Sequence, residues 1–269
     1  MSNQRSKPIK YYRVEAGKPQ LNETLVSIER EVALIVNGKA WMDLLCTPSH
    51  LDCLAAGFLF NEGLIHAQED LTSLNVCQGG EYVELTTAQA LAQPRYFHRT
   101  TGCSGGMTSL NLPEMPAPRL QDIHLAPAAV TQLLQQFLEA EKATVETRGV
   151  HCSALSDGQE ILAIMDDIGR HNTLDKLAGY CLLNLVSLPQ PVVLTTGRIS
   201  SEMLQKSAHL GASVIISLNS PNDYAISLAR SWGITLVGYA RSNGFNLYTH
   251  PARIVGADLP DPLDGSFAD

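Results

Sequence analysis

Hydrophobic and polar positions alternate in short runs over the first third of the chain. Two such runs, residues 31–36 and 40–46, flank Asn37-Gly38, which predicts a β-hairpin with a type I′ turn. A second pair, residues 73–77 and 82–86, flanks a glycine-containing turn and predicts another hairpin. We therefore expect a curled antiparallel sheet in this part of the chain.

One long helix is expected between the two hairpins. Pro48 suits a first helical turn, and Ser49 with Asp52 predicts a capping box, so the helix should run from there to about Glu62. Residues 1–10 are polar and are expected to be frayed. Together with the hairpins, this helix predicts a small α+β domain over residues 1–120, ending in a Pro-rich linker.

From about residue 128 the rhythm changes to short apolar strands that alternate with helices. The expected strands are residues 150–155, 161–165, 192–195, 213–218, 234–239 and 246–249. The expected helices start near residue 128, at 173–185, 201–210 and 223–232. This pattern predicts an α/β domain over residues 121–269, with a mostly parallel sheet covered on both faces. Ligands of such sheets bind beyond the carboxyl ends of the strands.

Charge and composition exclude several functional classes. The 269 residues carry a net charge of −8, which argues against a protein that grips the nucleic-acid backbone with clustered Lys and Arg. The longest apolar stretch, residues 51–65, is interrupted by polar side chains, so we expect no membrane span. The first residues lack the pattern of an export signal, so we expect a cytoplasmic protein with six reduced cysteines.

The first candidate for chemistry is Cys103, which lies in Thr101-Gly-Cys-Ser-Gly-Gly106. Glycines let the backbone turn sharply and direct several N–H groups at one point, and such a nest stabilises a thiolate. His98 and Arg99 would add positive charge if the loop folds back. A small buried cysteine in a tight turn would have the same sequence, and the residues alone favour neither interpretation.

Two polar runs follow strands of the second domain. Residues 166–176 combine carboxylates with Arg170 and His171, and residues 195–202 contain Gly197 and Arg198 at an expected helix start. Helix N-termini and arginines bind phosphate groups, so both runs are candidates for ligand contacts. Structural capping explains part of each pattern, although the density of polar groups in the first run favours a function.

A metal site is not expected. Cys46, His50 and Cys53 have helical spacing, and His151 adjoins Cys152, but no paired C-x-x-C supports either group. Cysteines of the core explain both patterns, so we expect no bound zinc.

Five motifs in order make the chain resemble the formate dehydrogenase accessory sulfurtransferase family, over residues 31–254. They are Thr47-Pro48 leading to Gly57-Phe-Leu-Phe-Asn-Glu-Gly63, the glycine-flanked Cys103, Asp167-Ile-Gly-Arg-His-Asn-Thr-Leu-Asp-Lys176, Thr196-Gly-Arg-Ile-Ser200 with Lys206, and residues 245–250.

The resemblance implies a sulfur carrier. Proteins of this family accept persulfide sulfur from a cysteine desulfurase and pass it to molybdenum bis(molybdopterin guanine dinucleotide), the cofactor of formate dehydrogenase. The persulfide cysteine maps onto Cys103. The cofactor-binding segment maps onto Phe245, Asn246, Leu247, Tyr248, Thr249 and His250. On pattern alone, the apolar members of this segment would be ordinary core residues.

The resemblance also implies a cytidine-deaminase-like, three-layer α/β/α fold for the second domain, and it is compatible with a homodimer. The deaminase zinc signature is missing, so deamination is not expected. Many relatives carry Cys-x-x-Cys in the loop, whereas this chain has Gly106 at the second position, which excludes a disulfide within the loop. A non-covalent chaperone that delivers the cofactor to the apoenzyme is therefore the alternative function.

Overall fold

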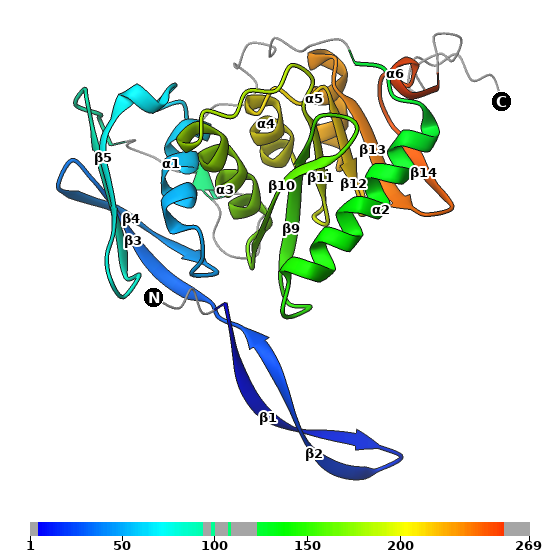
Figure 1. Cartoon of the computed structure of the whole chain (residues 1–269), viewed down its shortest axis with the longest axis horizontal. Helices are drawn as coiled ribbons and strands as arrows, with labels where there is room; N and C mark the ends of the chain where they lie inside the picture. Colours follow the sequence, from blue (N-terminus) through cyan, green and yellow to red (C-terminus); the bar gives the residue numbers. More distant parts are fainter. Residues whose placement is uncertain (1–4, 94–97, 100–106, 109–122, 256–269) are drawn as a thin grey trace.

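The computed structural model describes residues 5–93, 98–99, 107–108 and 123–255. It contains a six-stranded sheet, a four-stranded sheet and a long β-hairpin that projects from the body (Figure 1). The short strands β7 (His98–Arg99) and β8 (Met107–Thr108) form an antiparallel pair. Among the described residues, no helix combines the length and apolar character needed to cross a bilayer.

The six-stranded sheet belongs to the second half of the chain and has the order β10-β9-β11-β12-β13-β14. Its strands are β9 (His151–Ser156), β10 (Ile161–Asp167), β11 (Val192–Thr195), β12 (Val214–Ser217), β13 (Thr235–Arg241) and β14 (Gly244–Leu247). Only β11–β12 and β12–β13 are parallel. The prediction of a mostly parallel sheet was wrong, because short turns reverse the chain between β9 and β10 and between β13 and β14.

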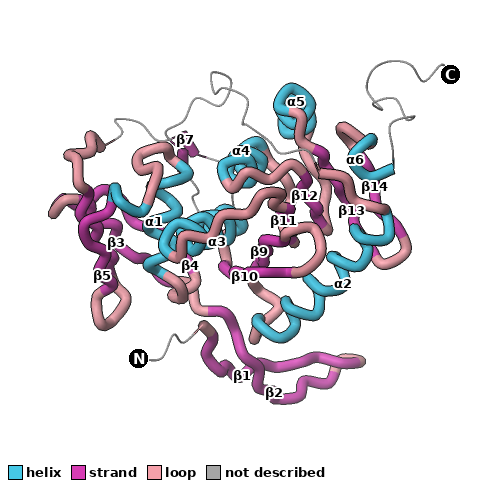
Figure 2. Tube along the Cα trace, turned by 45° about the horizontal axis from the view of Figure 1, so that its top comes forward, coloured by secondary structure: helices cyan, strands magenta, loops and turns pink. Residues whose placement is uncertain are grey.

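Helices cover both faces of this sheet (Figure 2). They are α2 (Pro127–Thr144) on one face, and α3 (Arg170–Leu183), α4 (Ser201–His209) and α5 (Asp223–Trp232) on the other. The short helix α6 (Ala252–Val255) follows β14. Successive residues of the central strands therefore enter two different cores, as Val193 and Leu194 of β11 do. The α/β class is confirmed, while the likeness to cytidine deaminases stays a prediction.

The four-stranded sheet of the first half has the order β4-β3-β6-β5, with α1 packed on it. These elements are β3 (Arg30–Val36), β4 (Lys39–Cys46), α1 (Leu51–Asn61), β5 (Leu71–Val76) and β6 (Tyr82–Thr87), with a single 3₁₀ turn at Gln68–Asp70. Asn37 and Gly38 have φ of 52° and 73°, which confirms the type I′ turn between β3 and β4. Both predicted hairpins are confirmed, as the antiparallel pairs β3–β4 and β5–β6, and the two hairpins are joined by a parallel pairing of β3 with β6 at the centre of the sheet.

Helix α1 begins later than the sequence indicated. It starts at Leu51, its N-cap is His50 in a left-handed conformation, and no side chain caps it. The predicted capping box was wrong, because the Ser49 hydroxyl accepts a hydrogen bond from Lys176 Nζ at 3.4 Å instead. Ser49 thus serves the contact between the two halves rather than the start of the helix.

Helices α1 and α3 lie against each other where two glycines face the opposite backbone. A Cβ atom at Gly57 would lie 1.8 Å from the carbonyl oxygen of Asp175, and one at Gly179 would lie 1.9 Å from the carbonyl oxygen of Cys53. Real Cβ atoms do not come this close to backbone, so only glycine permits this separation. The two halves of the chain are therefore joined through a close helix–helix contact.

Replacing Gly57 by alanine should push these helices apart. We expect Gly57→Ala to lower the free energy of unfolding by about 1–3 kcal/mol, because the added methyl group overpacks against rigid backbone. Urea unfolding measures this change. In the matched control Gly149→Ala, the new Cβ would lie 3.3 Å from the Ser27 hydroxyl, and the loss should stay below about 0.5 kcal/mol. Equal losses in both variants would contradict the close approach.

The N-terminal segment is ordered from Ser6 onward. Residues Ser6–Glu15 form β1 and pair in antiparallel fashion with β2 (Lys18–Ser27) over their whole length. The prediction that residues 1–10 are frayed was therefore wrong for residues 6–10. Ala16 and Gly17, both with positive φ, form the turn between the two strands.

Candidate functional site

Cys103, the predicted sulfur carrier, lies outside the described residues. In the sequence it falls between the paired strands β7 and β8, whose register joins His98 to Thr108 and Arg99 to Met107. Figure 2 shows β7 between α1 and α4, near the contact between the two halves of the chain. The role of Cys103 therefore stays a prediction, and the other cysteines bear on it by comparison.

Four of the five described cysteines are poorly suited to nucleophilic chemistry. Burial raises the pKa of Cys46 and of Cys53 to about 12 each and that of Cys181 to about 11, and it also raises the pKa of Cys152. At neutral pH such thiols are protonated, and the thiolate is the reactive form. Cys77 is half-buried, as Cys181 is, but it differs from the other four in that its sulfur accepts hydrogen bonds from two backbone N–H groups.

The predicted polar run at residues 166–176 begins with two carboxylates that hold other segments in place. Asp166 accepts a bond from Arg5 at 2.9 Å. Asp167 pairs with Lys176 Nζ at 2.6 Å, with both side chains fully buried, and accepts bonds from the backbone N–H groups of Thr47 and Gly169. Lys176 Nζ also donates to the carbonyl oxygens of Thr47 and Asp166. These groups are therefore used in joining the two halves of the chain.

A second buried ion pair involves Asp175, the residue next to Lys176 in α3. Lys206 Nζ of α4 lies 2.5 Å from Asp175 Oδ2 of α3, and Asn61 Nδ2 of α1 donates to Asp175 Oδ1 at 2.8 Å. Gln205 adds a bond from its side-chain amide to the carbonyl oxygen of Asn61. Three helices thus share one charge network. The sequence signalled Asp175 and Lys206 through the family motifs, but nothing in it placed them together.

The remaining members of the two runs meet at the carboxyl edge of the six-stranded sheet. His171 Nε2 lies 3.4 Å from the Ser200 hydroxyl and 3.9 Å from Glu202 Oε2, where Ser200 is the N-cap of α4 and Glu202 lies in its first turn. Burial lowers the pKa of His171, so the imidazole is neutral at pH 7. Arg170 is buried at the same edge, whereas Arg198 is exposed. The edge thus offers one exposed cation beside a buried polar cluster.

Gly197 shapes the backbone between β11 and α4. A Cβ atom there would lie 3.0 Å from Arg170 Cβ, so glycine lets this loop lie directly on α3. The Thr195 hydroxyl accepts a bond from the N–H of Gly197, and the side chain of Asn219 donates to the carbonyl oxygen of Thr196. Contacts with α3, Thr195 and Asn219 hold this loop in place, so its polar groups keep one fixed arrangement.

Glu202 should make stability depend on pH in the acid range. Burial raises the pKa of Glu202, but hydrogen bonds from His171 and Ser200 outweigh this effect and lower it to about 2 from 4.5. Its contribution is therefore present above pH 4.5 and lost as the pH falls towards 2. We expect wild type to exceed Glu202→Gln in unfolding free energy at pH 6, with the difference shrinking between pH 4.5 and 2. Urea titrations at each pH measure this, and a constant difference would contradict the assignment.

The predicted cofactor segment lies on β14, an edge strand, and just beyond it. Phe245 and Leu247 pack on the core beneath α2, whereas Tyr248 packs on the opposite core, with its ring against Gly238. Asn246 is exposed. Phe245 and Asn246 therefore lie near the edge of the sheet that carries Arg170 and Arg198, since β14 starts at that edge, and the Tyr248 ring extends towards it beside Gly238 and Asn219.

Thr249 and His250 are used structurally. The Thr249 hydroxyl donates to the carbonyl oxygen of Ile234 and accepts from the N–H of Leu236, and this side chain is fully buried. His250 Nε2 lies 2.9 Å from the carbonyl oxygen of Arg230. Both residues lie near the edge of the sheet opposite to the edge that carries Arg170. The predicted segment thus contains two kinds of residue. Phe245, Asn246 and Tyr248 are available to a ligand, whereas Thr249 and His250 fix the backbone of the segment in place.

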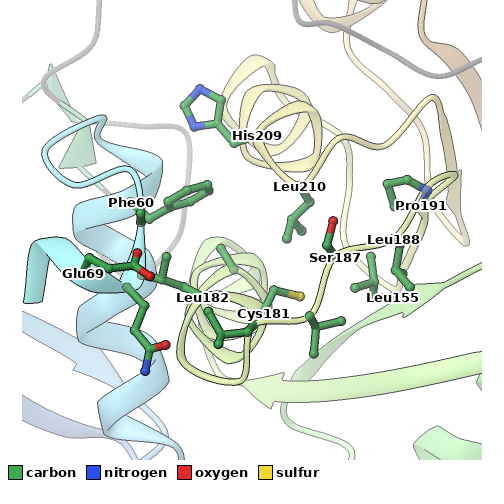
Figure 3. Close-up of a pocket in the computed structure, with 15 residues that line it drawn as sticks. Phe60, Glu69, Leu155, Cys181, Leu182, Ser187, Leu188, Pro191, His209 and Leu210 are labelled. Atoms are coloured by element: carbon green, nitrogen blue, oxygen red, sulfur yellow. The ribbon is translucent and has the colours of Figure 1, made fainter.

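Two cavities lie away from the edge of the sheet that carries Arg170 and Arg198. The first, of about 330 Å³, is lined mainly by apolar side chains between α1, α3 and α4, among them Phe60, Cys181 and Leu210 (Figure 3). The second, of about 750 Å³, is polar and is lined by His50 and Cys77 among others. Within the described part of the chain, no group of three or more His, Cys, Asp or Glu side chains is placed to hold a metal ion.

Comparison with known proteins decides the family. Residues 27–255 match the model of the FdhD/NarQ family. The chain belongs to this family. The match covers both sheets and the helices between them, and it begins where the projecting hairpin ends.

Relatives in the FdhD/NarQ family carry a consistent name. Sulfur carrier protein FdhD from Bacillus subtilis is 36% identical over 90% of this chain and 95% of its own length. The protein of the same name from Geobacillus kaustophilus is 35% identical over 93% and 96%. A crystal structure from Desulfotalea psychrophila, of a protein assigned as a formate dehydrogenase accessory protein, has a TM-score of 0.75 at 28% identity and covers 93% of this chain and 99% of its own.

Proposed function

We propose that this protein is a sulfur carrier that serves formate dehydrogenase, with Cys103 as the residue that carries the sulfur. The observation on which the residue assignment depends is the state of the other thiols. Burial keeps Cys46, Cys53, Cys152 and Cys181 protonated, as their raised pKa values indicate. Two cysteines remain, and of these only Cys103 lies in a glycine-rich loop that the family motif matches.

The chemistry proposed for Cys103 is thiol exchange with a persulfide. Its thiolate attacks the terminal sulfur of a donor persulfide, the donor S–S bond breaks, and the donor cysteine leaves as a thiolate. Cys103 then bears the sulfur as its own persulfide. A cysteine desulfurase is the expected donor, because this class of enzyme holds sulfur in that form. We expect these steps to take place in the cytoplasm, where thiols are kept reduced.

The proposed acceptor is molybdenum bis(molybdopterin guanine dinucleotide), bound as substrate at the carboxyl edge of the six-stranded sheet. Phe245 and Tyr248 offer aromatic rings and Asn246 an exposed amide near that edge. Arg198 is exposed at the same edge and suits a phosphate group. Delivery of the sulfur as sulfide restores the Cys103 thiolate and consumes two electrons, which come from reduced molybdenum or from a thiol reductant.

Mass spectrometry tests the carrier step directly. After incubation with a cysteine desulfurase and cysteine, tryptic peptides should show one additional sulfur atom on Cys103, which dithiothreitol removes. Cys77 is the internal control, because it is only half-buried and lies outside the family motif. Sulfur found on Cys77 alone would move the assignment to that residue, and sulfur on neither would contradict the function.

Gly106 favours one alternative, a chaperone that delivers the cofactor without covalent chemistry. Without a second cysteine the loop cannot release sulfur by forming its own disulfide. The two functions differ in their need for a thiol. A chaperone would bind guanine dinucleotide and activate the apoenzyme equally well with or without Cys103.

A further inference from the structure

Tyr239, near the end of β13, has a backbone conformation that bulky residues rarely adopt. Its φ is 50°, in the left-handed region that favours glycine. The register between β13 and β14 is interrupted here, so that two residues, Tyr239 and Ala240, lie opposite the single residue Phe245. Such a β-bulge redirects a side chain, and bulges are frequent beside active sites. A tyrosine in a strained conformation of this kind is typical of a functional site.

The side chain of Tyr239 lies in solvent rather than in a core. It is 48% exposed, although both of its neighbours, Gly238 and Ala240, are buried. It is the most exposed of the described tyrosines outside the projecting hairpin. Packing in a core therefore does not account for the conformation, because the strained backbone directs much of the ring away from the body of the protein.

Tyr239 lies at the carboxyl edge of the six-stranded sheet, in line with Arg198. Strands β11, β12 and β13 are parallel neighbours, so their carboxyl ends lie at one edge, where ligands of such sheets bind (Figure 1). Asn219, which follows β12, bridges the ends of the other two strands. Its side chain donates to the carbonyl oxygen of Thr196 at 2.7 Å, and its own carbonyl oxygen accepts from the N–H of Tyr239 at 3.1 Å. The segments that carry Arg198 and Tyr239 are thus fixed relative to each other.

The charge around Tyr239 suits a ligand that carries phosphate. Arg198 and Arg241 are both exposed, and Arg241 Nη1 is held by the carbonyl oxygens of Leu218 and Ala240, each at 2.7 Å. None of the residues 196–200, 218–222 and 239–243 is acidic, so the three segments carry two positive charges in a chain whose net charge is −8. An exposed ring between two arginines matches a planar base joined to phosphate groups.

We propose that Tyr239 is the residue on which the guanine base of the cofactor stacks, while Arg198 and Arg241 contact its phosphate groups. The inference rests on the proposed function, because it assigns a base to the edge of the sheet proposed there for the cofactor. Phe245 and Tyr248 of the family segment are partly packed in the two cores, whereas Tyr239 offers an open ring. Stacking on an aromatic side chain contributes roughly a factor of five to a hundred to the affinity for a base.

Binding of guanosine diphosphate and of pyrophosphate to the full chain separates the base from the phosphate groups. In calorimetry, Tyr239→Leu should raise the dissociation constant of guanosine diphosphate about tenfold or more and that of pyrophosphate less than about twofold. Tyr239→Phe keeps the ring and should stay within about threefold of wild type for both ligands. The matched control is Tyr224→Leu on α5, because Tyr224 is also an exposed tyrosine, at 38%, and both dissociation constants should stay within about twofold.

A glycine variant distinguishes a contact with the ligand from a role in folding. Glycine adopts a φ of 50° without steric cost, whereas leucine does not. The urea midpoint of Tyr239→Gly should therefore exceed that of Tyr239→Leu, while both variants lose affinity for guanosine diphosphate to a similar extent. Affinity that follows the urea midpoint instead would show that the ring acts through the fold, and it would overturn the inference.

Two further outcomes separate this inference from the function on which it rests. Equal affinity of wild type and Tyr239→Leu for guanosine diphosphate would overturn the role of Tyr239 and leave the proposed cofactor site in place. Wild-type protein that does not bind guanosine diphosphate at 1 mM would overturn both. An equal loss for guanosine diphosphate and pyrophosphate in Tyr239→Leu would also contradict stacking, because pyrophosphate has no base.

Discussion

A protein with Cys103→Ala is expected to lose the ability to activate formate dehydrogenase. Activation in an extract that lacks the endogenous carrier should fall at least about a hundredfold, because loss of a nucleophile removes the covalent step rather than weakening it. The readout is formate oxidation by the recipient enzyme after incubation with donor, carrier and cofactor. Binding of guanosine diphosphate, measured by calorimetry, should remain unchanged, since the proposed contacts for the cofactor lie on β14 and at Arg198.

The matched control for this experiment is Cys77→Ser. Cys77 is half-buried, its sulfur accepts a backbone hydrogen bond, and it lies outside the family motif. Activation should stay within about twofold of wild type in this variant. Full activity of Cys103→Ala would exclude a sulfur carrier and favour the chaperone. Loss in both variants would indicate that the two thiols act in sequence.

The second large effect is expected on stability, from Lys176→Met. Removal of the ammonium group leaves Asp167 buried with its charge uncompensated, which costs about 3–5 kcal/mol in the free energy of unfolding. The same change also removes donors to the carbonyl oxygens of Thr47 and Asp166. Urea unfolding at pH 7 measures the loss. Lys142→Met, at an exposed position in the last turn of α2, is the matched control and should change stability by less than about 0.5 kcal/mol.

A double variant separates charge from packing at this position. In Asp167→Asn with Lys176→Met no unpaired charge remains, so part of the loss should be recovered relative to Lys176→Met alone. A double variant as unstable as the sum of the single variants would show that the two residues act independently. That outcome would contradict the ion pair as the main link at this point between the halves of the chain.

Several elements could be predicted from local pattern, because their cause is local. The strand Val192–Thr195 and the helix Asp223–Trp232 have the predicted bounds. A short apolar run determines the ends of the strand, and a capped amphipathic run determines the ends of the helix. The type I′ turn at Asn37-Gly38 followed from the φ values that these residues tolerate. The strand directions in the six-stranded sheet could not be predicted in this way. They depend on which strands become neighbours, and a single strand carries no such information.

The same distinction applies to the candidate site. Sequence pattern showed that residues 166–176 and 195–202 are unusually polar. Only the fold showed that Asp167 and Asp175 form buried ion pairs, and that His171 is buried and Arg198 exposed at the carboxyl edge of the sheet. The predicted segment 245–250 was divided in a similar way. The Thr249 hydroxyl is already engaged in two hydrogen bonds with the backbone, and the spacing of residues in the sequence does not predict these bonds.

The amino-acid sequence by itself determined the α/β class, the positions of most helices and strands, and the family, because these depend on local periodicity and on motifs in a fixed order. Tertiary structure decided which cysteines are protonated by burial, which polar groups are already paired, and that residues 6–27 form a projecting hairpin. The physical reason is that burial, charge pairing and strand neighbours arise from contacts between residues far apart in the chain. Gly57 and Asp175, 118 positions apart, meet only once the chain has folded.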